Sequence, residues 1–136
     1  MFYGGKHADG NTENCLIVFK DSTYIELIGL VKPAALDDPN GMHATLFNLG
    51  EGWAGFALLS EDLEHNVTEM QQRGLTLSGA YDNSRHQPDG ELVAWRAATL
   101  STDMMPFFLQ DRTPHIMRVI DDERTQHANG ATGATR

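Results

Sequence analysis

The sequence predicts a single α+β domain, from three observations. The chain has 136 residues, of which 40% are hydrophobic and 21% charged, a composition typical of one globular domain. One segment, residues 60–74, has the apolar spacing of a helix. Short runs of strand-like residues precede and follow it. Over residues 53–111 the predicted order is therefore strand, helix, strand, strand, strand.

The helix is predicted from its ends as well as from its spacing. Ser60 or Asp62 can cap its start, acidic residues fill its first turn, and Gly74 can end it. Its apolar positions fall at i, i+4 and i+7, in the order Leu63, Val67 and Met70. This pattern gives one apolar stripe for packing against a sheet.

A β-hairpin is predicted near the N-terminus. Two apolar runs, "CLIVF" at 15–19 and "YIELIGL" at 24–30, are separated by the turn-forming "KDST". Side chains on both faces of both runs are apolar, which favours a sheet covered on two sides. The one charge in the second run is Glu26, and alternation places it on the same face as Tyr24 and Ile28.

The strands around the helix are "GWAGFALLS", "LTLSGAY", "SRHQPDGELVAWRAATL" with its turn at 88–90, and "MPFFLQD". The hairpin region looks like the last two or three strands of a similar unit. We therefore expect one domain over 1–115, with a partial first module (1–31), a connector (32–52) with at most a short helix at 42–49, and a βαβββ module (53–111). Residues 116–136 are expected to form an extension with a mobile end.

Charge and composition restrict the partners. A formal charge of -9, from 19 acids and 10 bases, argues against nucleic acid, because phosphate binding needs clustered Lys and Arg. No stretch has the length of a membrane span or the pattern of a secretory signal. The single cysteine, Cys15, fits a reducing compartment. We expect a cytoplasmic protein whose ligand is small, and neutral or cationic.

Several short motifs occur in an order that resembles the glyoxalase-like branch of the vicinal oxygen chelate superfamily. In the first half they are Gly4, Gly5 and His7, then Thr12 and Asn14, then "YIEL" at 24–27. In the second half they are Arg85, "PDG" at 88–90, Trp95 with Arg96, "PFF" at 106–108, and His115. The resemblance covers roughly residues 4–115.

The resemblance implies βαβββ modules that form a curved mixed sheet, with a concave cavity face and helices on the convex face. Members typically carry a further strand and helix before "GGKH", so the first module is expected to be incomplete. An open sheet edge and an uncovered face would follow, and a homodimer is the simplest remedy.

The resemblance also implies which side chains face the cavity. The expected ligand-binding residues are His7, Asn14, Tyr24, Glu26, Trp95, Arg96, Phe108, Gln110 and His115. His7 is expected in a Gly-rich loop, and either Phe107 or Phe108 must face the cavity because neighbours in a strand point to opposite faces.

Glu26 has three alternative roles. It can contact a ligand, it can be a buried carboxylate paired with a Tyr or with Arg96, or it can bind a metal. In metal-dependent members the equivalent position often supplies a carboxylate ligand. A catalytic site needs about three protein ligands, and the usual His position on the strand that opens the second module falls near Gly55. No cofactor is therefore expected, although a divalent metal is possible with Glu26 as its ligand.

The favoured function is binding, and sequestering, a small organic molecule in a largely apolar cavity, as drug-binding members do. The first alternative is a metal-dependent lyase, isomerase or dioxygenase in which Glu26 acts as the catalytic carboxylate. The second is a degenerate module kept as an interaction domain. We therefore lean towards a protein that is not an enzyme.

Overall fold

The computed structural model describes residues 1–31, 50–100 and 106–134. Its strands are β1 (Phe2–His7), β2 (Thr12–Val18), β3 (Tyr24–Leu30), β4 (Ala57–Leu59), β5 (Tyr81–His86), β6 (Leu92–Ala98) and β7 (Phe107–Asp111). Its helices are α2 (Leu63–Gln72), α3 (His115–Arg118) and the 3₁₀ turn η2 (Glu123–Thr125).

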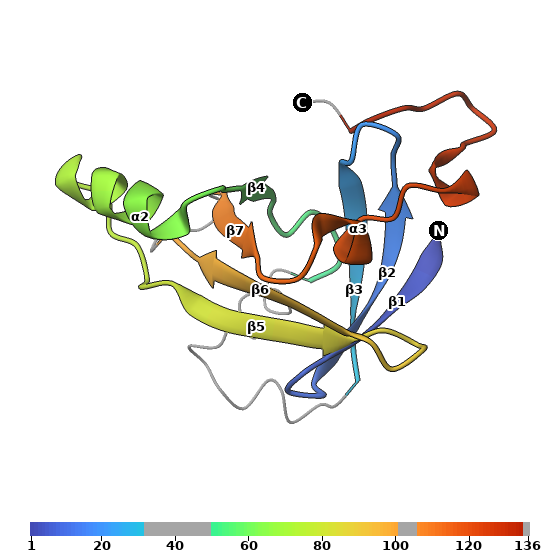
Figure 1. Ribbon diagram of the computed structural model, residues 1–136, viewed down its shortest axis with the longest axis horizontal. Coiled ribbons are helices and arrows are strands. Elements are labelled where there is room, and N and C mark those ends of the chain that lie inside the picture. The colour runs from blue at the N-terminus through green and yellow to red at the C-terminus, as the bar shows by residue number, and fades with distance from the viewer. Residues whose placement is uncertain (32–49, 101–105, 135–136) are drawn as a thin grey trace.

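The seven strands make one curled sheet in the order β3-β2-β1-β5-β6-β7-β4 (Figure 1). Neighbouring strands are antiparallel except β4 and β7, which run parallel. The order β4, α2, β5, β6, β7 confirms the predicted βαβββ unit, and the fold class is α+β as predicted. The first half has three strands and no counterpart of β4 and α2 among the described residues. The short helix expected at 42–49 lies outside the described residues.

The Gly-rich segment before the hairpin is a strand, so the prediction of a loop around His7 is wrong. Residues Phe2–His7 form β1, which pairs with β2 on one side and with β5 on the other. The pairing with β2 shifts register between Tyr3 and Gly5, where Gly5 has a φ of 125°. A side chain at Gly5 would collide with the carbonyl oxygen of His86. Gly5, which reads as a loop former in the sequence, is therefore needed so that β1 and β5 can approach closely.

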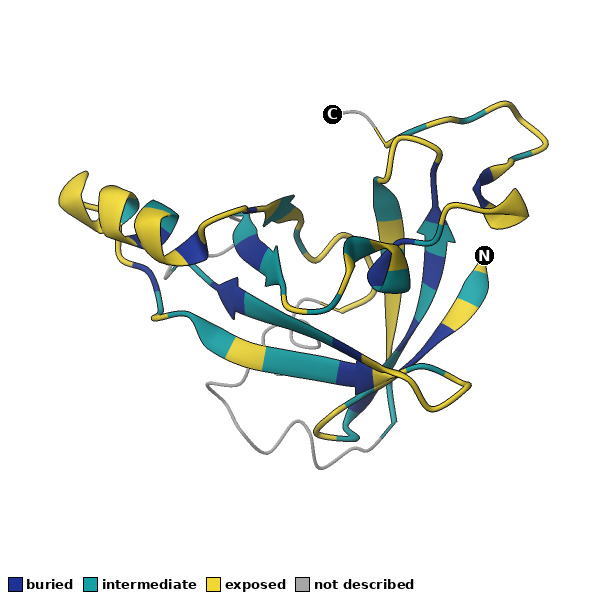
Figure 2. Ribbon diagram, viewed as in Figure 1, coloured by how far each residue is buried: buried dark blue, intermediate teal, exposed yellow. Residues whose placement is uncertain are grey.

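Helix α2 begins as its sequence predicts. The Asp62 side chain caps it by accepting a hydrogen bond from the His65 amide at 3.0 Å. Its buried residues, Leu63 and Val67, pack with Ala98 and Phe108 of the sheet. Figure 2 shows one buried stripe on an otherwise exposed helix. We call the side of the sheet that packs against α2 the outer face, and the opposite side the inner face.

The chain beyond residue 115 contributes to the core. Val119 is 3% exposed and packs with Leu16 and Val18 on the inner face of the hairpin. The predicted boundary at residue 115 therefore falls inside the packed structure. Further on, the His127 ring lies 2.8 Å from the Val18 carbonyl oxygen, and the Ala134 amide donates to Thr23 Oγ1 at 2.8 Å. The described part of the tail lies against the hairpin turn, and the mobility of its end stays a prediction.

Within the described ranges, no helix is long and apolar enough to cross a membrane.

Replacing Gly5 with alanine should destabilise the fold, because a Cβ there meets backbone and the residue keeps a positive φ. We expect a loss of about 2 kcal/mol or more in the free energy of unfolding, measured by urea titration. Gly79→Ala is the matched control, since nothing lies within 4 Å of its added Cβ. Equal stability of the two variants would contradict the close approach of β1 and β5.

Candidate functional site

A polar cluster on the inner face joins β1, β2 and β3. His7 Nδ1 lies 2.6 Å from Thr12 Oγ1, and His7 Nε2 lies 3.7 Å from Glu26 Oε1. The same Glu26 oxygen accepts a hydrogen bond of 2.6 Å from Asn14 Nδ2. Trp95 meets the His7 ring edge to face, with centroids 6.2 Å apart. Four strands therefore meet around the carboxylate that stood out in the sequence.

The contacts of this cluster involve one of the two carboxylate oxygens of Glu26. Its side chain is 26% exposed, and the contacts from Asn14 and His7 both reach Oε1. Its Oε2 has no hydrogen-bond partner within the ranges that the structure describes. A carboxylate oxygen has room for more than one donor, so Glu26 keeps accepting capacity toward the inner face.

Asn14 is held by a glycine opposite it. Asn14 is 4% exposed, and its Oδ1 lies so near Gly4 that a Cβ at that position would overlap it. This Oδ1 has no hydrogen-bond partner among the described residues. The amide is oriented by the bond from its nitrogen to Glu26, and Gly4 provides the space for that orientation.

Arg85 lies next to the cluster, on β5, where it pairs with His7 of β1. It is 2% exposed and donates a hydrogen bond to the carbonyl oxygen of Gly4, across the join between β5 and β1. Burial lowers the pKa of Arg85, while the nearby Glu26 carboxylate opposes that shift. A guanidinium stays charged in proteins, so Arg85 supplies a buried positive charge close to Glu26.

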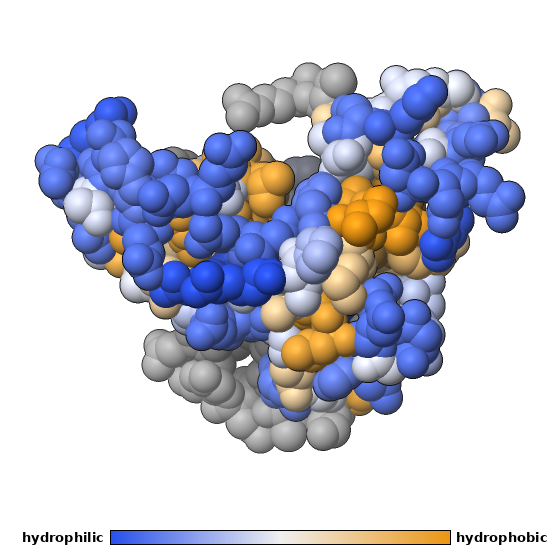
Figure 3. Space-filling view, viewed as in Figure 1, coloured by the Kyte–Doolittle hydropathy of each residue, from blue (hydrophilic) through white to orange (hydrophobic). Residues whose placement is uncertain are grey.

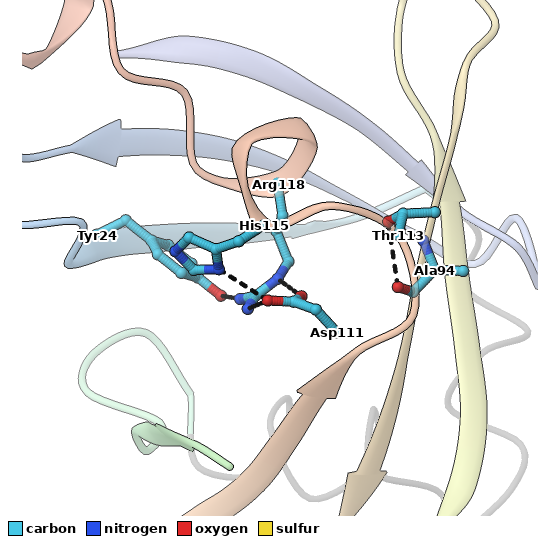
Figure 4. A network of polar contacts seen from close by, with 6 residues as sticks. All are labelled: Tyr24, Ala94, Asp111, Thr113, His115 and Arg118. Carbon is cyan, nitrogen blue, oxygen red and sulfur yellow. Dashed lines mark hydrogen bonds and ion pairs between the residues drawn. The ribbon is translucent and has the colours of Figure 1, made fainter. Parts of the chain in front are cut away.

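A second network fixes α3 to the inner face (Figure 4). Arg118 Nε donates to Asp111 Oδ1 at 2.7 Å, and Arg118 Nη1 donates to the Tyr24 hydroxyl at 2.8 Å. His115 Nδ1 lies 2.7 Å from Asp111 Oδ2. Residues 94 apart in the sequence are therefore linked through one guanidinium.

The charges of this network compensate one another. Burial by itself raises the pKa of Asp111, but the hydrogen bonds and charges of Arg118 and His115 outweigh burial and hold the pKa below its ordinary 3.8. Burial raises the pKa of Tyr24, and the charge of Arg118 only partly offsets that effect. Tyr24 thus stays a neutral phenol at physiological pH.

The comparisons with known proteins agree with this architecture. A family model described as a glyoxalase-like domain matches residues 1–136. The chain belongs to the glyoxalase-like family. A search of curated proteins finds no match. A solved structure of a hypothetical protein from Staphylococcus aureus is similar with a TM-score of 0.76 and 20% identity, over 86% of this chain and 52% of that one. The chain thus spans about half the length of that protein, and the likeness concerns the fold.

The glyoxalase-like domain brings together six of the nine residues expected to bind a ligand. Five of them lie on the inner face of the sheet: His7, Asn14, Tyr24, Glu26 and Trp95. The sixth, His115, contacts Asp111 of this face from α3. Whether they bind a ligand stays a prediction.

The other three residues lie on the outer face, beside α2. Arg96 pairs with Glu64 at 2.7 Å, so its expected pairing with Glu26 is wrong. Gln110 donates to the carbonyl oxygen of Glu61 at 2.6 Å. Phe108 belongs to the core under the helix. Alternation then places Phe107 on the inner face, so Phe108 does not share that face with Glu26 as expected.

Sequence reasoning missed four members of the two networks. Thr12 and Arg85 stand in the motifs that carried the resemblance, but neither was given a role. Asp111 ends the predicted strand "MPFFLQD" without an assigned role, and Arg118 stands in none of the motifs. Asp111 ends β7, and His115 and Arg118 stand at the two ends of the short helix α3, about one helical turn apart. This spacing was the signal in the sequence that the three side chains could meet.

Two open hollows of the glyoxalase-like domain are lined by residues other than Glu26. One, of about 460 Å³, lies between β1, the β5–β6 turn and α3, and its lining includes Phe2 and Ile116. Figure 3 shows hydrophobic surface around α3, next to this hollow. The other, of about 400 Å³, has Trp95, Asn83 and Arg112 in its lining. An apolar cavity enclosing Glu26 stays a prediction.

Among the described residues, the donor set does not fit the metal that some members of the superfamily hold. Over the described ranges, no three His, Cys, Asp or Glu side chains come together in a group that could bind an ion. His7 and Glu26 offer two donors, one fewer than a catalytic site needs.

The Asp111 network should make the fold sensitive to acid. The lowered pKa means that Asp111 contributes stability above its unfolded-state pKa of 3.8, and that this stability is lost as pH falls through the lower folded-state pKa. Asp111→Asn should cost about 3 kcal/mol at neutral pH, because it leaves Arg118 buried without its counter-charge. It should also remove part of the acid dependence, measured by urea titration from pH 2 to 7. Asp82→Asn, with a largely exposed side chain, is the control. An unchanged acid dependence would contradict this role.

Proposed function

We propose that this glyoxalase-like domain binds a small organic molecule on the inner face of its sheet and sequesters it. The observation that carries the proposal is the environment of Glu26. Its carboxylate is oriented by Asn14 and His7, yet its Oε2 has no hydrogen-bond partner among the described residues, and the side chain is partly exposed. A preorganised acceptor of this kind suits a ligand that presents an N–H or O–H group.

Aromatic side chains near Glu26 offer apolar contact for the rest of the ligand. Trp95 is half-buried beside His7, and Tyr24 stands two residues before Glu26 on the same face of β3. Sites for small molecules typically combine such rings with a few fixed polar groups. The combination supports a ligand with an apolar body and one polar end.

The charges of the inner face favour a ligand that is neutral or carries one positive charge. Arg118 is neutralised by Asp111, and Arg85 lies near Glu26. A strongly anionic ligand would be repelled by the partly exposed Glu26 carboxylate. A cationic ring system could instead stack on Trp95 and approach Glu26.

A metal-dependent reaction is the alternative from a different class. It is favoured only by the closeness of His7 Nε2 and Glu26 Oε1, at 3.7 Å. The third and weakest alternative is an interaction domain without a small ligand. A cytoplasmic location is part of the same proposal, because the lone Cys15 suits a reducing compartment.

The binding proposal predicts thermal stabilisation by at least one member of a panel of apolar amines and neutral amides. A ligand at one hundred times its Kd adds about 2.7 kcal/mol, which raises the Tm by several degrees. Glu26→Gln should lower the affinity of an amine at least about tenfold, because the charge-assisted bond is lost. The control is Glu64→Gln on the outer face, which should bind normally. Equal affinity of the two variants for the amine would show that Glu26 does not contact the ligand.

The metal alternative has its own test. The protein is incubated with Zn²⁺, Mn²⁺ or Fe²⁺, desalted, and analysed for bound metal, in parallel with His7→Ala and Glu26→Ala. We expect less than one equivalent bound and no difference between the variants, since two donors hold an ion weakly. One equivalent of metal that both substitutions remove would favour the lyase, isomerase or dioxygenase class. Absence of both metal and compound binding would favour the interaction domain.

A further inference from the structure

Two polar groups of the Asp111 network keep hydrogen-bonding capacity that the network does not use. They are the hydroxyl of Tyr24 and the imidazole of His115, which contact Arg118 and Asp111 respectively. Arg118 and Asp111 bind each other twice, through Nε and Oδ1 at 2.7 Å and through Nη2 and Oδ2 at 2.9 Å. This pair therefore fixes both groups, and each contact determines what the free side of the group can do.

The Tyr24 hydroxyl is left as a hydrogen-bond donor. A guanidinium has no acceptor, so the hydroxyl oxygen accepts from Arg118 Nη1 at 2.8 Å and its own hydrogen points elsewhere. No acceptor for this hydrogen is found in the described part of the chain. Burial raises the pKa of Tyr24, so the phenol keeps its hydrogen at physiological pH. Tyr24 can therefore donate one hydrogen bond to a bound molecule.

His115 is left with an acceptor. An ionised carboxylate only accepts, so His115 Nδ1, at 2.7 Å from Asp111 Oδ2, carries the ring hydrogen. In the neutral imidazole the lone pair is then on Nε2, and Figure 4 shows this second nitrogen pointing away from Asp111. The His115 side chain is 36% exposed, and its Nε2 has no partner among the residues that the structure describes. Nε2 can therefore accept one hydrogen bond.

The charges beside these two groups favour a neutral partner. The Arg118 cation and the Asp111 anion neutralise each other, and their side chains are only 7% and 14% exposed. Neither an ammonium nor a carboxylate would gain an unpaired counter-charge from this pair. A secondary carboxamide is neutral and planar, and it offers one oxygen acceptor together with one N–H donor.

We propose that Tyr24 and His115 bind a carboxamide group of the ligand, with the Tyr24 hydroxyl donating to the amide oxygen and His115 Nε2 accepting from the amide N–H. This inference rests on the proposed function, because it adds a second polar contact on the same inner face. Tyr24 and Glu26 stand two residues apart on one face of β3, which places their Cα atoms about 7 Å apart. A ligand with an aromatic body can therefore reach both.

A matched pair of probes tests the amide contact. N-methylnaphthamide and methyl naphthoate have the same shape and the same carbonyl oxygen, but the ester lacks the N–H. We expect the full chain to bind the amide about fivefold more tightly than the ester, since one neutral hydrogen bond is lost, measured by NMR titration. Equal affinity for the two probes, or no binding of the amide, would overturn the proposal.

Variants of the two residues separate their roles. His115→Ala should weaken the amide alone and so abolish the preference over the ester. Tyr24→Phe should weaken both probes by a similar factor, because both carbonyl oxygens accept from the hydroxyl. The controls are Tyr3→Phe, whose hydroxyl donates to Glu13, and His65→Ala on the exposed side of α2; both should keep the preference. A preference for the amide that persists in His115→Ala would contradict the assignment.

Nitrogen NMR of the His115 ring tests the tautomer without any variant. At about pH 8, where imidazole is neutral, Nε2 should give the signal of an unprotonated ring nitrogen, and N-methylnaphthamide should shift that signal but not the signals of His65. A ring hydrogen on Nε2 at this pH would overturn the proposal.

The failure of this inference can be told apart from the failure of the proposed function. If Glu26→Gln weakens amine binding while His115→Ala keeps the preference for the amide, the Glu26 site stands and the amide contact is wrong. If His115→Ala abolishes the preference while Glu26→Gln binds the amine normally, the amide contact stands and the role proposed for Glu26 is wrong.

Discussion

The pairing of β1 with β5 is the contact on which the rest of the structure depends. It is short, covering Lys6 with His86 and His7 with Arg85, yet it joins two halves into one sheet. Gly5 permits the approach, because any side chain there would strike the His86 carbonyl. Arg85 reinforces it by donating to Gly4, so a buried cation holds the join. His7 ends β1 at this join, which is why it can reach both Glu26 and Trp95.

A second constraint closes the curled sheet from the C-terminal side. Arg118 bridges Asp111 at the end of β7 and Tyr24 at the start of β3, two strands that are not neighbours. Such a pair is costly to bury, and it stabilises only because every charge has a partner. Val119 follows directly and packs on Leu16 and Val18. The polar network and the apolar cluster thus anchor the same short segment to the hairpin.

These constraints leave the two faces with different tasks. The outer face of the second half packs against α2. Arg96, Phe108 and Gln110 make their contacts there, with α2 and with Glu61 just before it. On the inner face, Glu26 lies among aromatic and basic neighbours, and its Oε2 has no hydrogen-bond partner in the described part of the chain. Among the described residues, a metal site at Glu26 and His7 would lack a third donor.

The sequence by itself determined the elements whose signals are local. Helix α2 follows from its cap and apolar spacing, the β2–β3 hairpin from two apolar runs around a turn, and the family from the order of short motifs. The face of Glu26 followed from alternation within one strand. Only the tertiary structure decided which strand faces join across the sheet, because register between distant strands leaves no periodic trace. That is why the sequence around His7 indicates a loop where the structure has β1, and why the face taken by Phe107 and by Phe108 was not predictable.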